Sequence, residues 1–182
     1  MTLEMSEIAP YLKMGATPPA GRLAARILEL AAEAPVESRG VWTREDSRCI
    51  LCGTVGCLFD QWLRALSVRS AADALIAQAI GAAAVEKVMD GIEDEIRSTL
   101  GEGEELLPRR SPGYGNVPLS VNAELLRKLD ASRRIGVSLT ESMLLVPSKS
   151  VVAVCDIFFK KPPCGRGEDM IYYPMFSRLL GW

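Results

Sequence analysis

The residues from Ser70 to Leu100 place the strongest constraint on the fold, because they read as one long helix with two different halves. Residues 74–85 contain only one polar side chain, Gln78, so this half should be buried on nearly all sides. Charged residues become frequent from Glu86 onward, while an apolar stripe continues at helical spacing (Val85, Met89, Ile92 and Ile96). We therefore expect the second half to pack one face against a core and to leave the other face in water.

The sequence predicts helices mainly in the first part of the chain and strands mainly in the later part. Besides the long helix, the expected helices cover residues 3–15, 23–34, 58–66, 120–129 (with Ser120 as N-cap) and 175–182. The expected strands cover residues 48–56, 142–147 and 151–159, the last two joined by a turn at residues 148–149. Residues 101–118 are rich in Gly and Pro and predict a long loop, which is uncommon in a compact domain unless it is functional or disordered.

The order of these elements predicts an α+β fold in one domain. A chain of 182 residues is long enough for one domain with a real core and short for two. The helix-rich first part and the strand-rich later part are typical of α+β proteins. Within a domain spanning residues 1–182 we distinguish a helical part (1–40), a core that carries the loop (41–159) and a tail with a short helix (160–182).

Composition excludes several kinds of function. The chain contains no histidine, which excludes histidine-dependent catalytic triads, histidine-ligated metals and histidine proton shuttles. The 21 Lys and Arg against 23 Asp and Glu argue against a general binder of nucleic acid or anionic membranes. The sequence contains no run of about 18 apolar residues, so we expect no membrane span. The first ten residues lack the features of a secretory signal and the cysteine count is odd, so we expect a cytoplasmic protein.

Three of the five cysteines, Cys49, Cys52 and Cys57, have a spacing that admits zinc or an iron–sulfur cluster. Positions 49 and 52 of one strand would, however, point to opposite faces, because their separation is odd. Cys155 and Cys164 have no further partners nearby in the sequence. We therefore favour core cysteines that act as small apolar side chains over a structural metal site.

The loop segment 109–115 (Arg-Arg-Ser-Pro-Gly-Tyr-Gly) is a candidate binding site. Its proline and glycines fix unusual backbone angles and allow a ligand to approach the main chain closely. An arginine such as Arg109 suits bidentate capture of a carboxylate or phosphate, and Tyr114 adds a flat face with one hydroxyl. A surface turn with a stacking tyrosine explains the same residues equally well.

Glu86 is a second candidate, because it follows the buried half of the long helix. A carboxylate at that point is partly desolvated and seeks a cationic partner, although it could merely begin the solvated face. If Arg109 faced Glu86, the guanidinium could hold a carboxylate and the glutamate an ammonium group. This arrangement is typical of a site for an α-amino acid.

The loop segment 109–115, together with residues 135–142 (Ile-Gly-Val-Ser-Leu-Thr-Glu-Ser) and 146–151 (Val-Pro-Ser-Lys-Ser-Val), resembles a known family. The chain is similar, over roughly residues 8–157, to the activation domain of cobalamin-dependent methionine synthase in its small free-standing form. The likeness includes residues 53–56 and 81–86. It implies one α+β domain with N-terminal helices and a long buried helix packed on a twisted antiparallel sheet.

The resemblance also implies a function and a set of site residues. Such domains bind S-adenosylmethionine and present it to a corrinoid whose cobalt has reached the inactive Co(II) state, so that reduction and methylation restore the cofactor. By motif position, Arg109 matches the residue that holds the ligand carboxylate, and Glu86 matches the one that meets its amino group. Ser111 matches a backbone contact, and Gly113 and Tyr114 match the remaining loop contacts.

The chain has no cobalamin-binding motif, so the resemblance implies that the corrinoid arrives on a partner. That partner is a corrinoid-binding methyltransferase or a split methionine synthase subunit, with a flavodoxin-like or ferredoxin-like protein as the reductant. An alternative from a different class is a non-catalytic module that docks on a corrinoid protein without using S-adenosylmethionine. A zinc or iron–sulfur protein is the third alternative.

Overall fold

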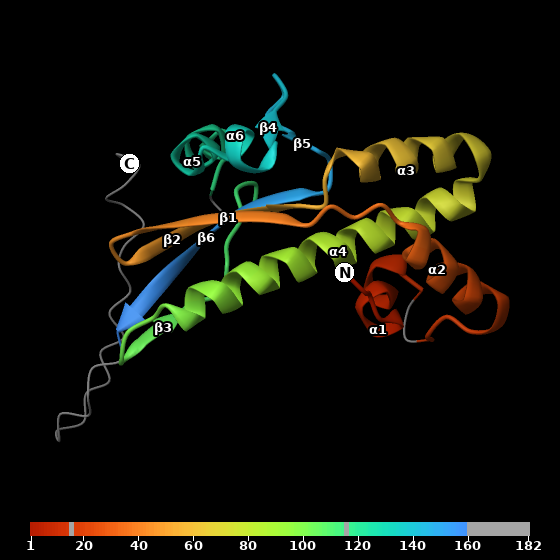
Figure 1. The fold of residues 1–182 in the computed structure, drawn as a ribbon, viewed down its shortest axis with the longest axis horizontal. Helices are drawn as coiled ribbons and strands as arrows, with labels where there is room; N and C mark the ends of the chain where they lie inside the picture. The colour runs from red at the N-terminus through yellow and green to blue at the C-terminus, as the bar shows by residue number, and fades with distance from the viewer. Residues whose placement is uncertain (15–16, 115–116, 160–182) are drawn as a thin grey trace.

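The fold is organised around one long helix, α4 (Ala71–Ser98), in a computed structural model that describes residues 1–14, 17–114 and 117–159 (Figure 1). Ser70 caps the helix, because its side-chain oxygen accepts a hydrogen bond from the Asp73 backbone N–H at 3.2 Å. The predicted long helix is thus confirmed. None of the described helices is both long enough and apolar enough to span a membrane.

The first half of α4 lies among the other N-terminal helices. These are α1 (Met5–Ile8), the 3-10 helix η1 (Ala9–Leu12), α2 (Gly21–Glu33) and α3 (Cys57–Arg69). Ile76, Ala77, Ile80 and Ala84 of α4 are buried in one apolar cluster with residues of α2 and α3. The expected burial of this half is confirmed except at Leu75 and Gln78, whose side chains are exposed.

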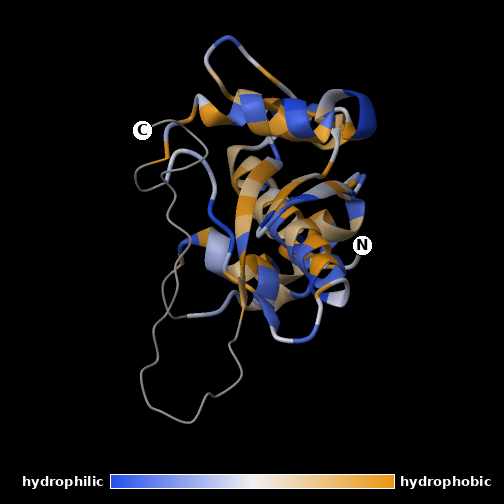
Figure 2. Cartoon of the chain, turned by 90° about the vertical axis from the view of Figure 1, so that its left-hand side faces the viewer, coloured by the Kyte–Doolittle hydropathy of each residue, from blue (hydrophilic) through white to orange (hydrophobic). Residues whose placement is uncertain are grey.

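The second half of α4 packs on an antiparallel sheet with the strand order β1-β2-β6-β3. The strands are β1 (Arg39–Glu45), β2 (Arg48–Thr54), β6 (Ser150–Phe159) and β3 (Glu104–Leu106). Helices α5 (Val121–Leu129) and α6 (Ala131–Ile135) cover the opposite face, where β4 (Ser138–Leu139) and β5 (Leu145–Val146) form a separate pair. Apolar residues gather where these layers meet (Figure 2). The expected α+β class is confirmed.

Alternation along the strands divides the sheet residues between two cores. Cys49 and Cys155 face α4, whereas Cys52 and Val154 face α5 and α6. The prediction that Cys49 and Cys52 point to opposite faces is therefore confirmed.

Two strands of the four-stranded sheet lie where the sequence predicted none. Strand β1 carries charged residues and a glycine at an edge of the sheet, so it lacks the continuous apolar run of a buried strand. Strand β3 lies inside residues 101–118, which the sequence predicted as one long loop, and it pairs with the end of β6. Strand β1 forms a local hairpin with β2, which begins three residues after β1 ends, whereas β3 depends on a partner that is distant in sequence.

The prediction that residues 142–147 form a strand paired through a turn with 151–159 is wrong. Leu145 and Val146 pair instead with Leu139 and Ser138. Thr140 closes this small hairpin, since its backbone N–H donates to the Leu144 carbonyl and its hydroxyl accepts from the Leu144 N–H. Ser120 is the N-cap residue of α5, as expected, but its side chain makes no capping hydrogen bond. The predicted helix at 175–182 lies outside the described residues.

Two glycines of α4 should respond in opposite ways to alanine. A Cβ at Gly81 would lie 2.6 Å from Cε1 of Phe59, a ring that is fully buried, whereas a Cβ at Gly91 would meet nothing within 4 Å. Alanine favours a helix by about 1 kcal/mol over glycine. We expect Gly91→Ala to raise the free energy of unfolding by about 0.5–1 kcal/mol and Gly81→Ala to lower it by about 1–3 kcal/mol. Urea unfolding measures both, and stabilisation by Gly81→Ala would contradict this packing.

Glu104 should make the stability depend on acid. Its carboxylate accepts two hydrogen bonds from Arg44 of β1 (2.6 and 3.1 Å) and one from the Gly101 N–H, and these bonds lower its pKa to about 2. A lowered pKa stabilises the fold fully above the ordinary value near 4.5, and this stability is lost as the pH falls toward 2. We expect Glu104→Gln to lower the melting temperature at pH 7, by an amount that shrinks between pH 4.5 and 2. A deficit independent of pH over this range would contradict the assignment.

Candidate functional site

Arg109 is positioned by a segment that continues from β3 along the edge of the sheet. The Leu107 N–H donates to the Asp156 carbonyl at 2.8 Å, and Arg110 and Val154 exchange two backbone hydrogen bonds of 2.9 Å. Because neighbouring residues of an extended segment point to opposite faces, Arg109 reaches α4 while Arg110 turns toward the other face. The segment is therefore part of the sheet edge and not a free loop.

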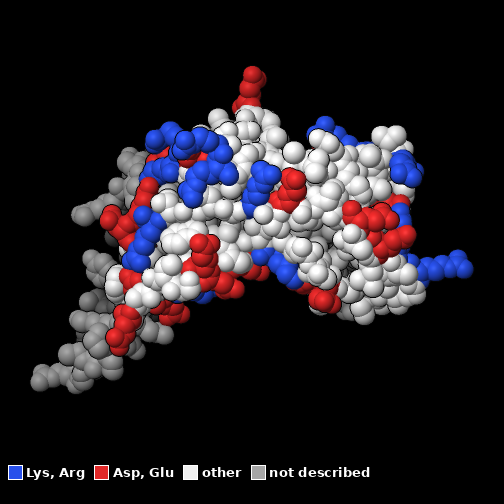
Figure 3. Space-filling view, in the orientation of Figure 1, with Lys and Arg blue, Asp and Glu red and all other residues white. Residues whose placement is uncertain are grey.

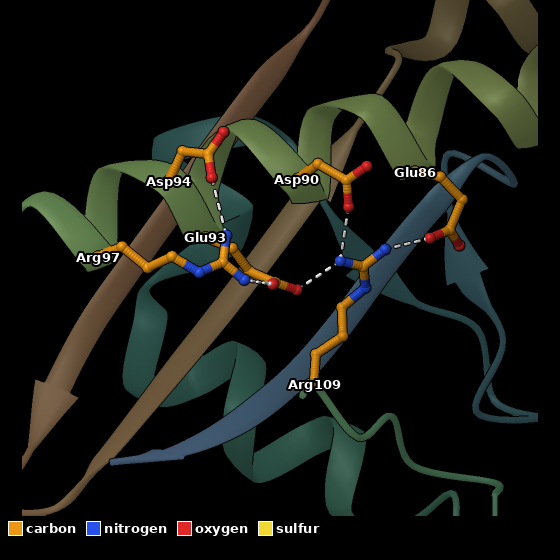
Figure 4. A network of polar contacts seen from close by, with 6 residues as sticks. All are labelled: Glu86, Asp90, Glu93, Asp94, Arg97 and Arg109. Atoms are coloured by element: carbon orange, nitrogen blue, oxygen red, sulfur yellow. Dashed lines mark hydrogen bonds and ion pairs between the residues drawn. The ribbon is translucent and has the colours of Figure 1, made fainter. Parts of the chain in front are cut away.

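Three carboxylates of α4 surround the Arg109 guanidinium (Figure 4). Glu86, Asp90 and Glu93 follow the i, i+4, i+7 spacing that places side chains on one helix face. Arg109 donates to Asp90 at 2.8 Å and makes closer hydrogen bonds to Glu86 and Glu93. The two predicted residues Glu86 and Arg109, which are 23 positions apart, are thus in direct contact.

The three carboxylates differ in their exposure to water. The Glu93 side chain is 7% exposed, that of Glu86 is 39% exposed and that of Asp90 is 65% exposed. Glu93 also accepts from Arg97 at 2.5 Å, and Arg97 donates to Asp94 at 2.8 Å. Glu93 therefore lies beside two cations, Arg109 and Arg97. Glu86 and Asp90 face solvent, and Arg109 is their one cationic partner among the described residues.

The ion pairs outweigh burial in setting the charge state of Arg109. Burial alone would lower the pKa of Arg109, but hydrogen bonds to Glu93, Asp90 and Glu86 raise it well above the ordinary value. The pKa of Arg97 is raised in the same way, with burial opposed by hydrogen bonds to Asp94 and Glu93. Both guanidinium groups are fixed positive charges.

Tyr11 of η1 is a neighbour of this site that sequence reasoning missed. Burial raises the pKa of Tyr11, the negative charges of Glu86 and Asp90 raise it further, and Arg109 opposes them. The side chain is 40% exposed, so it lies at the border between the acidic row and solvent. The helical spacing from Glu86 could have revealed Asp90 and Glu93, but no sequence signal links Tyr11 to α4.

The other predicted loop residues lie in a turn beyond Arg109. The Ser111 carbonyl accepts from the Tyr114 N–H at 3.3 Å, and the Gly113 N–H donates to the Val117 carbonyl at 2.8 Å. Gly113 has a φ of 89°, which a residue with a Cβ rarely adopts, and Tyr114 is 79% exposed. Among the described residues, no hydrogen bond or ion pair joins Ser111, Gly113 or Tyr114 to Glu86 or Arg109.

Arg110 belongs to a separate site on the opposite face. It donates to Asp156, which is 4% exposed and also accepts from Arg48 at 2.8 Å. An adjacent cavity of about 40 Å³ lies between the sheet and α5, with Pro112 and Leu125 in its wall. This volume holds a few water molecules and not a nucleoside.

A larger cavity, about 480 Å³, lies between α2, α3 and the start of α4. Its wall contains Trp62 and the pair Arg26–Asp73, joined by hydrogen bonds of 2.8 and 3.1 Å. Neither Glu86 nor Arg109 lines either of these two cavities. The side of the Arg109 site that carries Glu86 and Asp90, which are 39% and 65% exposed, faces solvent.

The buried cysteines are neutral thiols at neutral pH, because burial raises the pKa of Cys52 and of Cys155 to about 12. Within residues 1–14, 17–114 and 117–159, no three His, Cys, Asp or Glu side chains are grouped so as to hold a metal ion. Cys57 is exposed and free, and Cys164 lies outside the described residues.

No protein-family model and no curated protein matches this sequence. Among solved structures, the chain is similar to one described as the MetH reactivation domain bound to AdoHcy, with a TM-score of 0.54 and 15% sequence identity. The match covers 73% of this chain and 65% of that one, so this chain spans just under two thirds of its length. The protein therefore has a reactivation-domain-like fold and is a distant structural relative of that domain.

The contact between Arg109 and Glu93 should couple the two residues energetically. Arg109→Met leaves a carboxylate that is 7% exposed with one cation instead of two, and we expect it to lower the free energy of unfolding by about 1–3 kcal/mol. In a double-mutant cycle with Glu93→Gln, the interaction energy should be about 1 kcal/mol or more.

The exposed pair Arg133–Asp130 provides a matched control for this cycle. Its N···O distance is 2.6 Å, but the side chains are 85% and 47% exposed. The corresponding cycle with Arg133→Met and Asp130→Asn should give less than about 0.5 kcal/mol. Equal interaction energies for both pairs would show that the Arg109 contact is no stronger than a surface ion pair.

Proposed function

We propose that this protein binds S-adenosylmethionine through Arg109 and Glu86 and presents it to a corrinoid carried by a partner methyltransferase. The observation that carries the proposal is the contact between these two residues, which brings a guanidinium and a carboxylate together on an open surface. The same fold occurs in a protein described as bound to AdoHcy. AdoHcy carries the same amino-acid group as S-adenosylmethionine.

The amino-acid group of the ligand can exchange with the internal ion pair. When its carboxylate takes the place of Glu86 on Arg109, the freed glutamate can accept the ligand's ammonium group. Two charge-assisted contacts then replace one, and no charge is left without a partner. Glu93, almost fully buried, keeps Arg109 in place during the exchange.

The remaining loop residues would complete the ligand contacts. Tyr114 offers an exposed aromatic face beside the turn at Gly113, whose positive φ suits glycine and where an added Cβ would lie 2.9 Å from Cδ2 of Leu119. Ser111 would contribute backbone atoms. The protein's own part is to orient the ligand, while the methyl group and the cobalt supply the chemistry.

One observation favours the second candidate, a docking module that does not use S-adenosylmethionine. Arg109 already has three carboxylate partners, so the fold is electrostatically complete without a ligand. On this interpretation the network joins the sheet edge to α4, and the corrinoid partner binds elsewhere on the surface.

Titration calorimetry separates the two candidates. We expect micromolar binding of S-adenosylmethionine, weakened about tenfold or more by Arg109→Ala and by Glu86→Gln, because each removes one charge-assisted contact. Arg133→Ala removes an exposed arginine far along the chain and should leave binding unchanged. Thermal melts of each variant verify that it folds.

The absence of heat at saturating ligand, with a normal melting transition, would reject the first candidate. Retained binding to a cobalamin-loaded methyltransferase would then support the docking module. If S-adenosylmethionine bound the wild type and both site variants equally well, the ligand would occupy a different surface.

A further inference from the structure

We infer that Asp90 makes the site selective for a positively charged sulfonium ligand over the corresponding neutral thioether. This inference rests on the proposed function, because it concerns the same ligand surface. It adds a residue that the motif likeness does not include, and it concerns how the methyl donor is distinguished from its demethylated product.

The outer part of the network, formed by Arg109, Glu86 and Asp90, presents three charges. Arg109 contributes one positive charge, and Glu86 and Asp90 contribute two negative charges that are 39% and 65% exposed. S-Adenosylmethionine carries one negative carboxylate and two positive groups, the ammonium and the sulfonium. The site and the ligand therefore have the same number of charges with opposite signs.

The roles of the three protein charges follow from their contacts. Once the ligand carboxylate lies on Arg109 and its ammonium on Glu86, Asp90 is the carboxylate left over. Asp90 is one helical turn from Glu86 on the same face, and it also contacts Arg109 at 2.8 Å. S-Adenosylhomocysteine lacks the sulfonium charge, so it would leave Asp90 without a ligand partner.

The two acidic residues that follow Asp90 most closely on this helix, Glu93 and Asp94, are both paired with Arg97. Glu93 is 7% exposed and is shared between Arg109 and Arg97, and Asp94 is bound by Arg97. Asp90 has Arg109 as its one cationic partner among the described residues. Burial raises the pKa of Tyr11, and the charges of Glu86 and Asp90 raise it further, so Tyr11 lies near this carboxylate.

The wider surface is consistent with attraction of a cation. Along the lower left edge of the view in Figure 3, where the second half of α4 and β3 run, acidic side chains outnumber basic ones. An exposed charge acts over about a Debye length, which is roughly 10 Å at 0.1 M salt, so its effect on selectivity should diminish with added salt.

The test is the ratio of dissociation constants for S-adenosylhomocysteine and S-adenosylmethionine, measured by calorimetry on the full chain. We expect the wild type to prefer the sulfonium ligand and Asp90→Asn to reduce this preference about fivefold. Asp94→Asn is the matched control. Asp94 lies one helical turn after Asp90, its side chain is 77% exposed, and the substitution removes the same charge. It should leave the ratio unchanged.

Each outcome decides a separate question. A ratio that Asp90→Asn does not change, with both ligands still bound, overturns this inference and leaves the proposed function standing. Equal reductions by Asp90→Asn and Asp94→Asn overturn it too, because the effect would then reflect net charge alone. A wild-type protein that binds neither ligand overturns the proposed function itself.

Discussion

A guanidinium that loses most of its water must have negative charge beside it, and this requirement determines how the sheet edge meets α4. The Arg109 side chain is 22% exposed and lies between β6 and the helix, so it is stable there only with Glu93 and Glu86 as partners. Those partners can serve it because they lie on one face of a continuous helix. Packing of α4 on the sheet, the path of residues 107–110 and the geometry of the site are therefore parts of one arrangement.

The change of character along α4 explains why the site lies where it does. The first half of the helix packs against α2, α3 and the N-terminal turns, and its residues are mostly buried in their apolar cluster. After Glu86 the helix packs against the sheet on one side only, and its charged face is open to solvent. A carboxylate at this boundary, such as Glu86, is partly desolvated and therefore needs a cation beside it. It is also exposed enough to exchange that cation for a positive group of a ligand. Neither half of the helix alone would provide both conditions.

Local sequence patterns were sufficient for the long helix and for most of the other helices, although α6 was not predicted. The pairing of Glu86 with Arg109 was one of two interpretations of the residues, and the family resemblance supported it. The extent of the network could also have been read from the spacing of Asp90 and Glu93. Strands β1 and β3 could not. Strand β1 forms a local hairpin with β2 but carries charged residues and no apolar run, and β3 exists only through pairing with the distant β6. The position of Tyr11 depends likewise on the tertiary contact of η1 with α4.

The alternation of side chains at the sheet edge limits what the two adjacent arginines can do. Arg109 serves the α4 face, whereas Arg110 is committed to Asp156 on the α5 face, so they cannot act together on one ligand. A likeness at 15% identity establishes the fold, and a fold by itself does not establish a function. The proposed ligand site therefore consists of one guanidinium and the carboxylates around it. Their opposite charges and the shared helix face of the carboxylates suit the zwitterionic ligand with an additional positive charge that we propose.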